Sequence, residues 1–160
     1  MLRITRQTDY GILMLTFLAG KGGDAPVTTR ELSEWSKLSV PMVSKILKPL
    51  ARGGIVDSVR GAKGGYRRAR SPRDITVADI IGVLEGPIGM TACVTEPGSC
   101  EQEVVCPTKV NWERISHAVH GALDDIPLSD MLGSVPAHLL PARDELSAGT
   151  PTRLLTIERN

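Results

Sequence analysis

The sequence predicts a mainly α-helical protein with one small β-wing. Two observations predict this class: apolar residues recur at intervals of three and four positions in several segments, and two short β-prone runs flank the glycine-rich stretch "GAKGG". With 160 residues, the chain is long enough for one hydrophobic core. Aromatic residues make up only 3% of it, so we expect that core to be aliphatic.

The first helix is expected from about Thr5 to Ala19. Its apolar positions follow the helical rule that places every third or fourth residue on one face. These positions are Tyr10, Leu13, Met14, Phe17 and Leu18. Ile12 and Leu15 fall on another face, so we expect this helix to be buried on two sides.

Two further helices follow, separated by a short turn. Thr28 and Glu31 form a capping box that opens the first of them, which we expect to reach Ser36. The second begins after Ser39 and ends at the glycine pair 53–54. Its apolar face consists of Val43, Ile46, Leu47 and Leu50. Two short helices joined by a tight turn indicate a helix-turn-helix.

The opposite face of the second of these helices is polar. It carries Met42, Ser44, Lys45 and Lys48. Lysine neutralises DNA phosphates or donates to guanine edges, and serine donates to or accepts from either kind of base pair. A face of solvated lysines explains the same residues, and this helix alone does not separate the two interpretations.

The hairpin that follows is basic and supports DNA binding. Residues 55–60 and 66–70 are expected to pair, with the glycine-rich stretch as their tip. Glycines at the tip allow a close approach to a DNA backbone, and an arginine at the base suits a narrow minor groove. The spacing does not match a phosphate-binding P-loop, and no helix follows directly. The residues expected at DNA are Arg60, Lys63, Gly64, Gly65 and Tyr66.

A helix-turn-helix followed at once by a basic hairpin predicts a winged helix-turn-helix whose partner is a double-stranded DNA operator. The charge distribution agrees. Residues 1–75 carry a net charge of +8 and residues 76–160 a net charge of −7. We therefore divide the chain into a DNA-binding region (1–75), a region with the cysteines and a dimerisation helix (76–132), and a loose C-terminal tail (133–160).

Two helices are expected in the second region. The first begins after Thr76, which has Asp79 three residues on as a capping partner, and ends at Gly86. The second has apolar residues at heptad-like spacing: Trp112, Ile115, Val119, Ala122 and Ile126. This pattern is typical of a helix paired with a second copy of itself, and DNA-reading modules commonly bind as symmetric dimers. A helix that faces its own core is the alternative.

All three cysteines lie between these two helices. Cys93, Cys100 and Cys106 are spaced C-x6-C-x5-C. The chain starts without an apolar signal segment and has no apolar run near the roughly 18 residues of a membrane span, so we expect a cytoplasmic protein with reduced thiols and no membrane partner. Clustered reduced thiols indicate a metal site or a redox switch. Their spacing alone leaves zinc and an iron–sulfur cluster open.

Together these features resemble one family. The opening "MLRITRQTDYGILML", the helix-turn-helix, the wing "SVRGAKGGY" and three cysteines ahead of a long helix are similar to the Rrf-two family of iron–sulfur transcription regulators. The resemblance covers about residues 1–132 and is strongest to the subgroup that controls the SUF iron–sulfur assembly operon. It implies a homodimeric repressor with crossing long helices and one cluster (2Fe–2S or 4Fe–4S) per subunit.

The resemblance also implies roles for single residues. The three cysteines would hold the cluster, and Arg60 would enter the minor groove. Members with a histidine ligand carry it three residues after the last cysteine, where this chain has Lys109, a poor ligand when protonated. Some relatives use a carboxylate from the first helix of the other subunit, and Asp9 occupies that position. Asp9 has an alternative role at the start of its own helix, and Glu101 and Glu103 remain further candidates.

The sequence thus predicts a DNA-binding regulator that senses iron–sulfur status or redox and nitrosative stress. Two alternatives stay open: the same module with a zinc or thiol–disulfide switch, and an iron–sulfur carrier or electron-transfer protein that binds no specific DNA. An enzyme is disfavoured because no nucleophile–base pair or carboxylate pair falls on a recognisable site.

Overall fold

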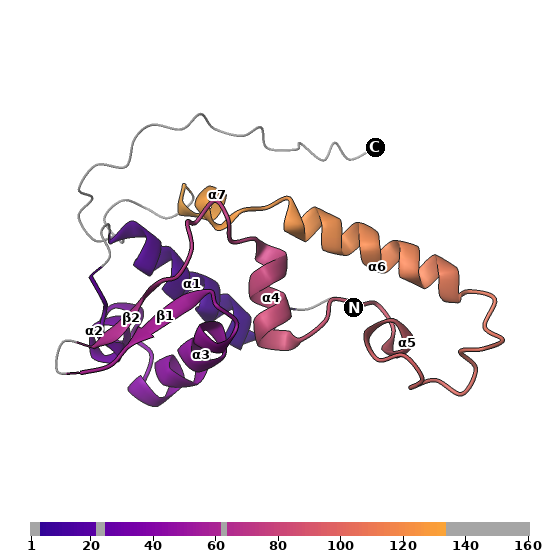
Figure 1. Ribbon diagram of the computed structural model, residues 1–160, viewed down its shortest axis with the longest axis horizontal. Coiled ribbons are helices and arrows are strands. Elements are labelled where there is room, and N and C mark those ends of the chain that lie inside the picture. The colour runs from indigo at the N-terminus through magenta and orange to yellow at the C-terminus, as the bar shows by residue number, and fades with distance from the viewer. Residues whose placement is uncertain (1–3, 22–24, 62–63, 134–160) are drawn as a thin grey trace.

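A computed structural model describes residues 4–21, 25–61 and 64–133. Its elements in chain order are α1(Arg6–Gly20), α2(Thr29–Ser36), α3(Val40–Arg52), β1(Val56–Val59), β2(Gly65–Arg68), α4(Val77–Glu85), α5(Ala92–Thr95), α6(Lys109–Asp124) and α7(Leu128–Leu132). The first three helices, the hairpin, α4 and α7 form one lobe, and α6 extends away from it with α5 near its far end (Figure 1). The predicted tail lies outside the described residues beyond Gly133.

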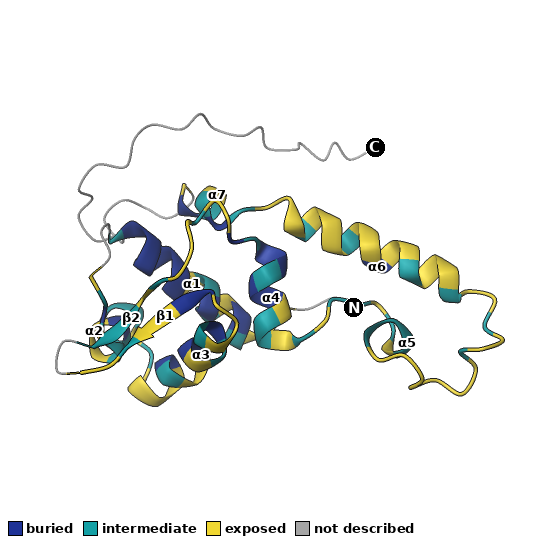
Figure 2. Ribbon diagram, in the orientation of Figure 1, coloured by how far each residue is buried: buried dark blue, intermediate teal, exposed yellow. Residues whose placement is uncertain are grey.

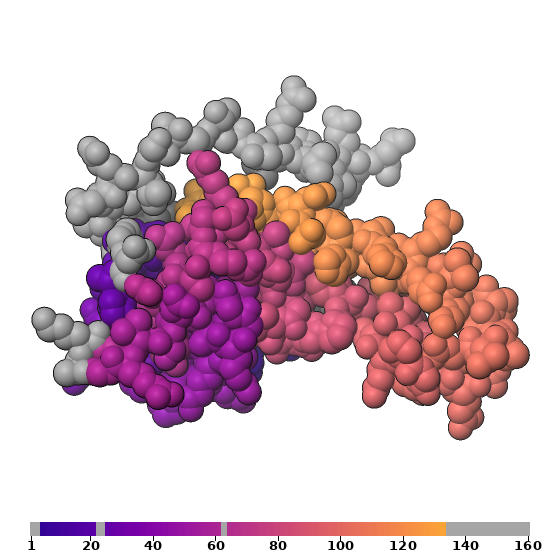
Figure 3. All heavy atoms as spheres, in the orientation of Figure 1, coloured from indigo at the N-terminus to yellow at the C-terminus, as the bar shows by residue number. Residues whose placement is uncertain are grey.

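The lobe is built around an aliphatic core, as the composition predicts. Its most deeply buried side chains come from most elements of the lobe: Met14, Leu15, Leu32, Val43, Ile46, Leu47, Leu50, Ile80 and Leu128. All four residues of the predicted apolar face of α3 are among them. Helix α1 is buried along most of its length, whereas α6 is largely exposed (Figure 2). With all heavy atoms drawn as spheres, α6 projects from the lobe (Figure 3). The lobe therefore has its own core, and α6 contributes little to it.

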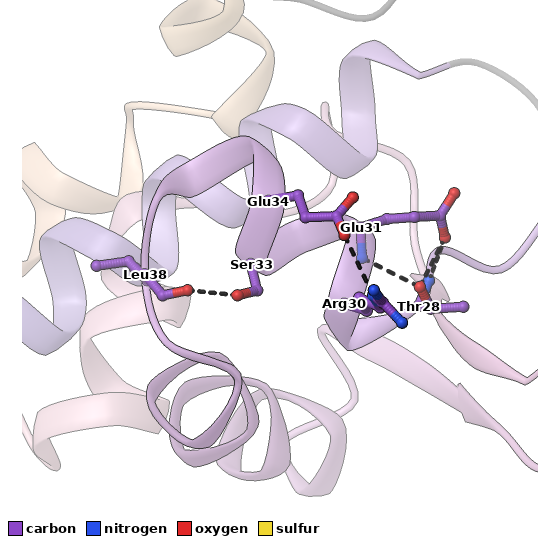
Figure 4. Close-up of polar contacts among 6 residues, drawn as sticks. All are labelled: Thr28, Arg30, Glu31, Ser33, Glu34 and Leu38. Atoms are coloured by element: carbon purple, nitrogen blue, oxygen red, sulfur yellow. Dashed lines mark hydrogen bonds and ion pairs between the residues drawn. The ribbon is translucent and has the colours of Figure 1, made fainter.

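The helix-turn-helix forms where the capping signals place it. The Glu31 amide donates to the Thr28 hydroxyl at 3.1 Å, and the Thr28 amide donates to the Glu31 carboxylate at 2.8 Å, so the predicted capping box is present (Figure 4). The Ser33 hydroxyl donates to the Leu38 carbonyl at 2.5 Å and fixes the turn between α2 and α3. Ser39 occupies the N-cap position of α3, but its side chain makes no capping hydrogen bond.

The predicted wing is an antiparallel hairpin. β1 pairs with β2 in the register Val56↔Arg68, Asp57↔Arg67, Ser58↔Tyr66 and Val59↔Gly65. A third extended segment joins it, because Val27 and Tyr66 exchange two backbone hydrogen bonds of 2.8 Å each. A side chain at position 65 would collide with the backbone of Val27, so this close approach requires Gly65. Val27, which directly precedes the N-cap of α2, thereby anchors the wing to the helix-turn-helix.

Helix α4 joins the lobe to the cysteines. Its predicted capping box between Thr76 and Asp79 is present. The helix packs closely on the C-terminus of α3, where a Cβ added to Gly53 would lie 2.5 Å from a methyl group of Val83. After α4 the chain runs outward to the far end of α6 and returns along it (Figure 1).

Three details differ from the expectations. The residues between α4 and α6 include a short helix that the sequence patterns do not predict, α5 (residues 92–95), which contains Cys93. Helix α6 is capped at Asp125, so Ile126 lies beyond the helix that was expected to include it. The chain then turns at Pro127 into α7, whose Leu128 is fully buried in the lobe.

Candidate DNA-binding face and cysteine segment

The exposed face of α3 carries the residues predicted to read DNA. Met42 is 38% exposed, Lys45 and Lys48 are exposed, and Ser44 is half-buried. Within the described part of the chain, neither lysine has an acidic partner. The buried aliphatic face fixes α3 in the lobe and presents these side chains outward.

Ion pairs neutralise part of the positive charge of the wing. Arg67 forms an ion pair with Asp57 across the hairpin at 3.5 Å, and Arg70 pairs with Asp79 on α4 at 3.1 Å. Arg60 is exposed and has no acidic partner among the described residues, which leaves it available to a polyanion. Gly64, Gly65 and Tyr66 are half-buried. Lys63, also predicted to contact DNA, lies outside the described residues.

The cysteine segment, residues 91–109, holds three free thiols. Cys93 and Cys106 are half-buried and Cys100 is exposed. The Cys93 sulfur lies 3.3 Å from the Thr91 hydroxyl, and the Cys106 sulfur lies 3.3 Å from the Thr108 hydroxyl. Each half-buried thiol is thus hydrogen-bonded to a threonine two residues away.

Cys106 lies two residues before Thr108, the N-cap of α6. Hydrogen bonds from the hydroxyl and the amide of Thr108 lower the pKa of its thiol, and the amide and ammonium group of Lys109 add to this effect. The thiolate therefore forms more readily at this position than at an unperturbed cysteine.

An ion pair joins Lys109, the last residue of the cysteine segment, to Glu103 within it. The Lys109 Nζ lies 2.8 Å from Glu103 Oε1 and 3.9 Å from Glu113 Oε1, and the amide of Gly98 donates to the Glu103 carboxylate at 2.6 Å. The hydrogen bond with Glu103 raises the pKa of Lys109, and the same bond lowers the pKa of Glu103. Lys109 is thus positively charged and has a structural role, and the Glu103 carboxylate is engaged in the ion pair with it.

Helix α6 presents an apolar stripe to its surroundings. Trp112 is 38%, Ile115 42% and, beyond the helix, Ile126 41% exposed. On another side, Ser116 is buried and its hydroxyl accepts a hydrogen bond from the Met90 amide at 3.0 Å. One side of the helix therefore binds the residues that lead into the cysteine segment. Of the predicted pairing stripe, Trp112, Ile115 and Ile126 are exposed, and Val119 is half-buried.

Glu85 joins the end of α4 to the start of α1, a contact that no pattern in the sequence indicates. Its carboxylate accepts hydrogen bonds from the Thr5 amide at 2.9 Å and the Thr8 hydroxyl at 2.5 Å, so the end of α4 binds the start of α1. Burial acts to raise the pKa of Glu85, but the hydrogen bonds from Thr8 and Thr5 lower it overall. Asp9, the next residue of α1, is exposed.

Comparison with known proteins decides the family. The model of the Rrf2 family, described as an iron-dependent transcriptional regulator, matches residues 4–134. The chain belongs to the Rrf2 family.

Several Rrf2 relatives are similar over most of their length. The transcriptional regulator CymR of Bacillus subtilis is 33% identical over 130 residues, which cover 81% of this chain and 89% of CymR. The solved structure of CymR, described as the global cysteine regulator of B. subtilis, aligns with a TM-score of 0.65 and 33% identity over 85% of this chain and all of that one. IscR from T. potens aligns with a TM-score of 0.62 and 33% identity over 92% of this chain and 94% of that one.

These likenesses settle the general activity. This Rrf2-family chain is a transcription regulator with a winged-helix fold, as the sequence predicts, and not an enzyme. Family membership also removes the iron–sulfur carrier alternative. In the part of the chain that the structure describes, no helix combines the length and the apolar character needed to cross a membrane.

The donor set of this Rrf2 chain fits a thiolate-bound metal group in chemistry but not in arrangement. Three free thiols, one with a lowered pKa, are suitable ligands for iron or zinc. Within residues 4–21, 25–61 and 64–133, however, no three side chains of His, Cys, Asp or Glu converge on a common point. Asp9, on α1, is therefore not brought together with the cysteines in one subunit, and a metal group requires the segment to close around it.

Proposed function

We propose that this Rrf2-family regulator binds operator DNA as a homodimer and that the state of its cysteine segment sets the affinity. The observation that carries the proposal is the connection through α4: this helix ends at Glu85, whose carboxylate holds the first turn of α1, and residues 86–90 lead from there to the cysteine segment. A rearrangement of the segment can therefore be transmitted through α4 to the first turn of α1.

The DNA-binding part of the proposal rests on α3 and the wing. Lys45, Lys48 and Arg60 are solvent-accessible cations without acidic partners among the described residues. We assign α3 to the major groove and Arg60 to the minor groove. Ser44 lies on the face that meets the bases, so it helps to define the operator sequence.

The homodimer is supported by the apolar stripe on α6. An isolated soluble domain rarely leaves a row of large apolar side chains uncovered along one helix. Trp112, Ile115 and Val119 repeat at heptad-like spacing, so two copies of the helix can pair along their length. A symmetric dimer also presents two reading heads to two operator half-sites.

For the sensor we propose an iron–sulfur cluster held by Cys93, Cys100 and Cys106, with Asp9 of the partner subunit as the fourth ligand. The description of the family as iron-dependent supports it. The group would supply a redox-active, oxygen- and nitric-oxide-sensitive centre when bound. The chain's own part is to provide thiolates, and the Thr108 hydrogen bonds favour that form at Cys106. Control of SUF assembly genes and a place in the cytoplasm, where thiols stay reduced, complete this proposal.

A second candidate is a thiol switch that holds no cluster. It is favoured by the separation of the three cysteines in this structure and by the similarity to CymR, which is described as a global cysteine regulator. Treatment with a thiol oxidant and then a reductant separates the two candidates. A colourless protein whose operator affinity changes reversibly supports the thiol switch, and a coloured protein that loses its response when the chromophore is removed supports the cluster.

The DNA-binding assignment is tested at the wing. An operator is first selected from random duplexes with the wild-type protein. Arg60→Ala should then weaken operator binding about tenfold or more, whereas Arg67→Ala, which removes an arginine already paired with Asp57, should have a smaller effect. If Arg60→Ala binds the operator as tightly as wild type at several salt concentrations, the wing does not contact DNA as proposed.

A further inference from the structure

A hollow on the lobe borders the DNA-reading face and has no role in the proposal above. It has a volume of about 510 Å³ and lies between the start of α1, the turn that joins α2 to α3, and the start of α3. Among the residues that line it are Arg6, Gln7, Tyr10, Lys37, Met42 and Lys45.

The hollow is strongly cationic. Arg6, Lys37 and Lys45 come from three different elements, and no acidic residue is among those that line the hollow. None of these cations has an acidic partner in the described part of the chain. By contrast, Lys21 and Arg30 on the same lobe are paired with Glu31 and Glu34. Three unneutralised cations around one concave surface favour an anion.

The backbone at Lys37 provides a second reason to assign a role to this side chain. Lys37 ends α2 in the left-handed conformation, with φ 60° and ψ 19°. It is the one non-glycine residue with positive φ among those described. A glycine or asparagine would adopt this conformation at lower cost. Lys37 therefore adopts a backbone conformation that is disfavoured for lysine, and its side chain contributes a cation to the hollow.

The position of the hollow identifies the anion. Met42 and Lys45 line the hollow and also belong to the face of α3 that we assign to the major groove. A duplex that occupies that face must bring a backbone strand across the start of α3. Gln7 and Tyr10 add neutral polar groups of the kinds that contact DNA phosphates.

We propose that this hollow holds a sugar–phosphate unit of the operator backbone, with Arg6 and Lys37 as its phosphate ligands and Lys45 between phosphate and bases. The inference rests on the proposed DNA binding and extends the interface to α1 and to the α2–α3 turn. These contacts fix the register of α3 on the duplex and carry no sequence information of their own.

The salt dependence of binding tests the proposal. With the full-length protein, affinity is measured at several salt concentrations for the selected operator and for a scrambled duplex. Arg6→Ala and Lys37→Ala should each lower the slope of log K against log salt by about 0.9, and should weaken binding to both duplexes by the same factor. Arg114→Ala, which removes an exposed arginine from α6, is the matched control and should leave the slope unchanged.

A second variant separates a binding role from a structural one. Lys37→Gly should raise the thermal midpoint, because glycine accepts the left-handed backbone, and should still lower the salt slope. An unchanged slope in Arg6→Ala and in Lys37→Gly would overturn the phosphate site while the proposed function stands. A loss confined to the operator would overturn it too, because backbone contacts do not distinguish sequences. A wild-type protein that binds no DNA would contradict the proposed function itself.

Discussion

The buried hydroxyl of Thr8 donates a 2.5 Å hydrogen bond to the carboxylate of Glu85, a residue 77 positions later in the chain. This contact joins the end of α4 to the first turn of α1. The chain continues from Glu85 through Gly86 toward the cysteines, and Arg6 on the same turn of α1 lines the cationic hollow. We expect this contact to carry movements of the cysteine segment to the DNA-binding lobe.

The contribution of this contact to stability is measurable. Glu85→Ala leaves the Thr8 hydroxyl buried without its acceptor and should lower the free energy of unfolding by roughly 1–2 kcal/mol. Glu85→Gln keeps an acceptor oxygen and should lose less. Glu96→Ala, the same truncation at an exposed position, is the control. Denaturant titration of the three variants measures the differences, and equal stability of Glu85→Ala and Glu96→Ala would show that the contact contributes nothing.

Acid should weaken the same contact. The pKa of Glu85 is lowered in the folded chain, because the Thr8 and Thr5 hydrogen bonds outweigh the opposing effect of burial. The unfolded chain therefore binds this proton more readily, and the stabilisation is present above the ordinary glutamate pKa and is lost as the pH falls through the folded value. Unfolding of wild type and Glu85→Gln should be compared from neutral to acid pH. The difference should shrink as the pH falls, and a constant difference would contradict this origin.

The packing of α4 on α3 depends on a glycine. In Gly53→Ala the new Cβ would meet the stiff, β-branched side chain of Val83 at 2.5 Å, so we expect a loss of about 1–3 kcal/mol. Gly82→Ala on α4 is the matched control, because nothing lies within 4 Å of its added Cβ, and it should be neutral or stabilising by up to about 1 kcal/mol. Thermal unfolding measures both, and similar midpoints for the two variants would rule out close packing at Gly53.

The apolar stripe on α6 should control self-association. Ile115→Glu places a charge in the middle of the stripe and should weaken dimerisation at least about tenfold, which corresponds to about 1.4 kcal/mol. Arg114→Glu introduces the same carboxylate at the neighbouring position, off the stripe, and should leave the dimer intact. Sedimentation equilibrium compares them. Dimers of equal strength in both variants, or a wild-type monomer, would show that α6 does not form the interface.

Local signals explain what could be predicted from the sequence. The capping pairs Thr28–Glu31 and Thr76–Asp79 and the apolar period of α3 act over a few residues, so they can be recognised without knowing the fold. Tertiary packing determines two other contacts, the hydrogen bond between Thr8 and Glu85 and the bridge between Val27 and Tyr66. No local sequence pattern predicts them. The same holds for α7, which forms because Leu128 fills the core of the lobe.

The candidate site also combines features that local sequence patterns predict with features that depend on the fold. The cations of α3 follow from helical spacing, but the neutralisation of Arg67 and Arg70 depends on partners that only the fold places beside them. The spacing of the cysteines identified the segment but not its geometry. The cationic hollow was missed because its three cations come from separate parts of the sequence and meet only after folding.

The central claim is that the state of the cysteine segment sets the affinity for DNA. The direct test measures operator affinity of one anaerobic preparation before and after it is supplied with iron and sulfide, with the visible spectrum recorded on the same samples. We predict a brown protein whose affinity changes by at least about fivefold, and a smaller change in Glu85→Ala. A sample that stays colourless and binds its operator equally before and after the treatment would contradict the account.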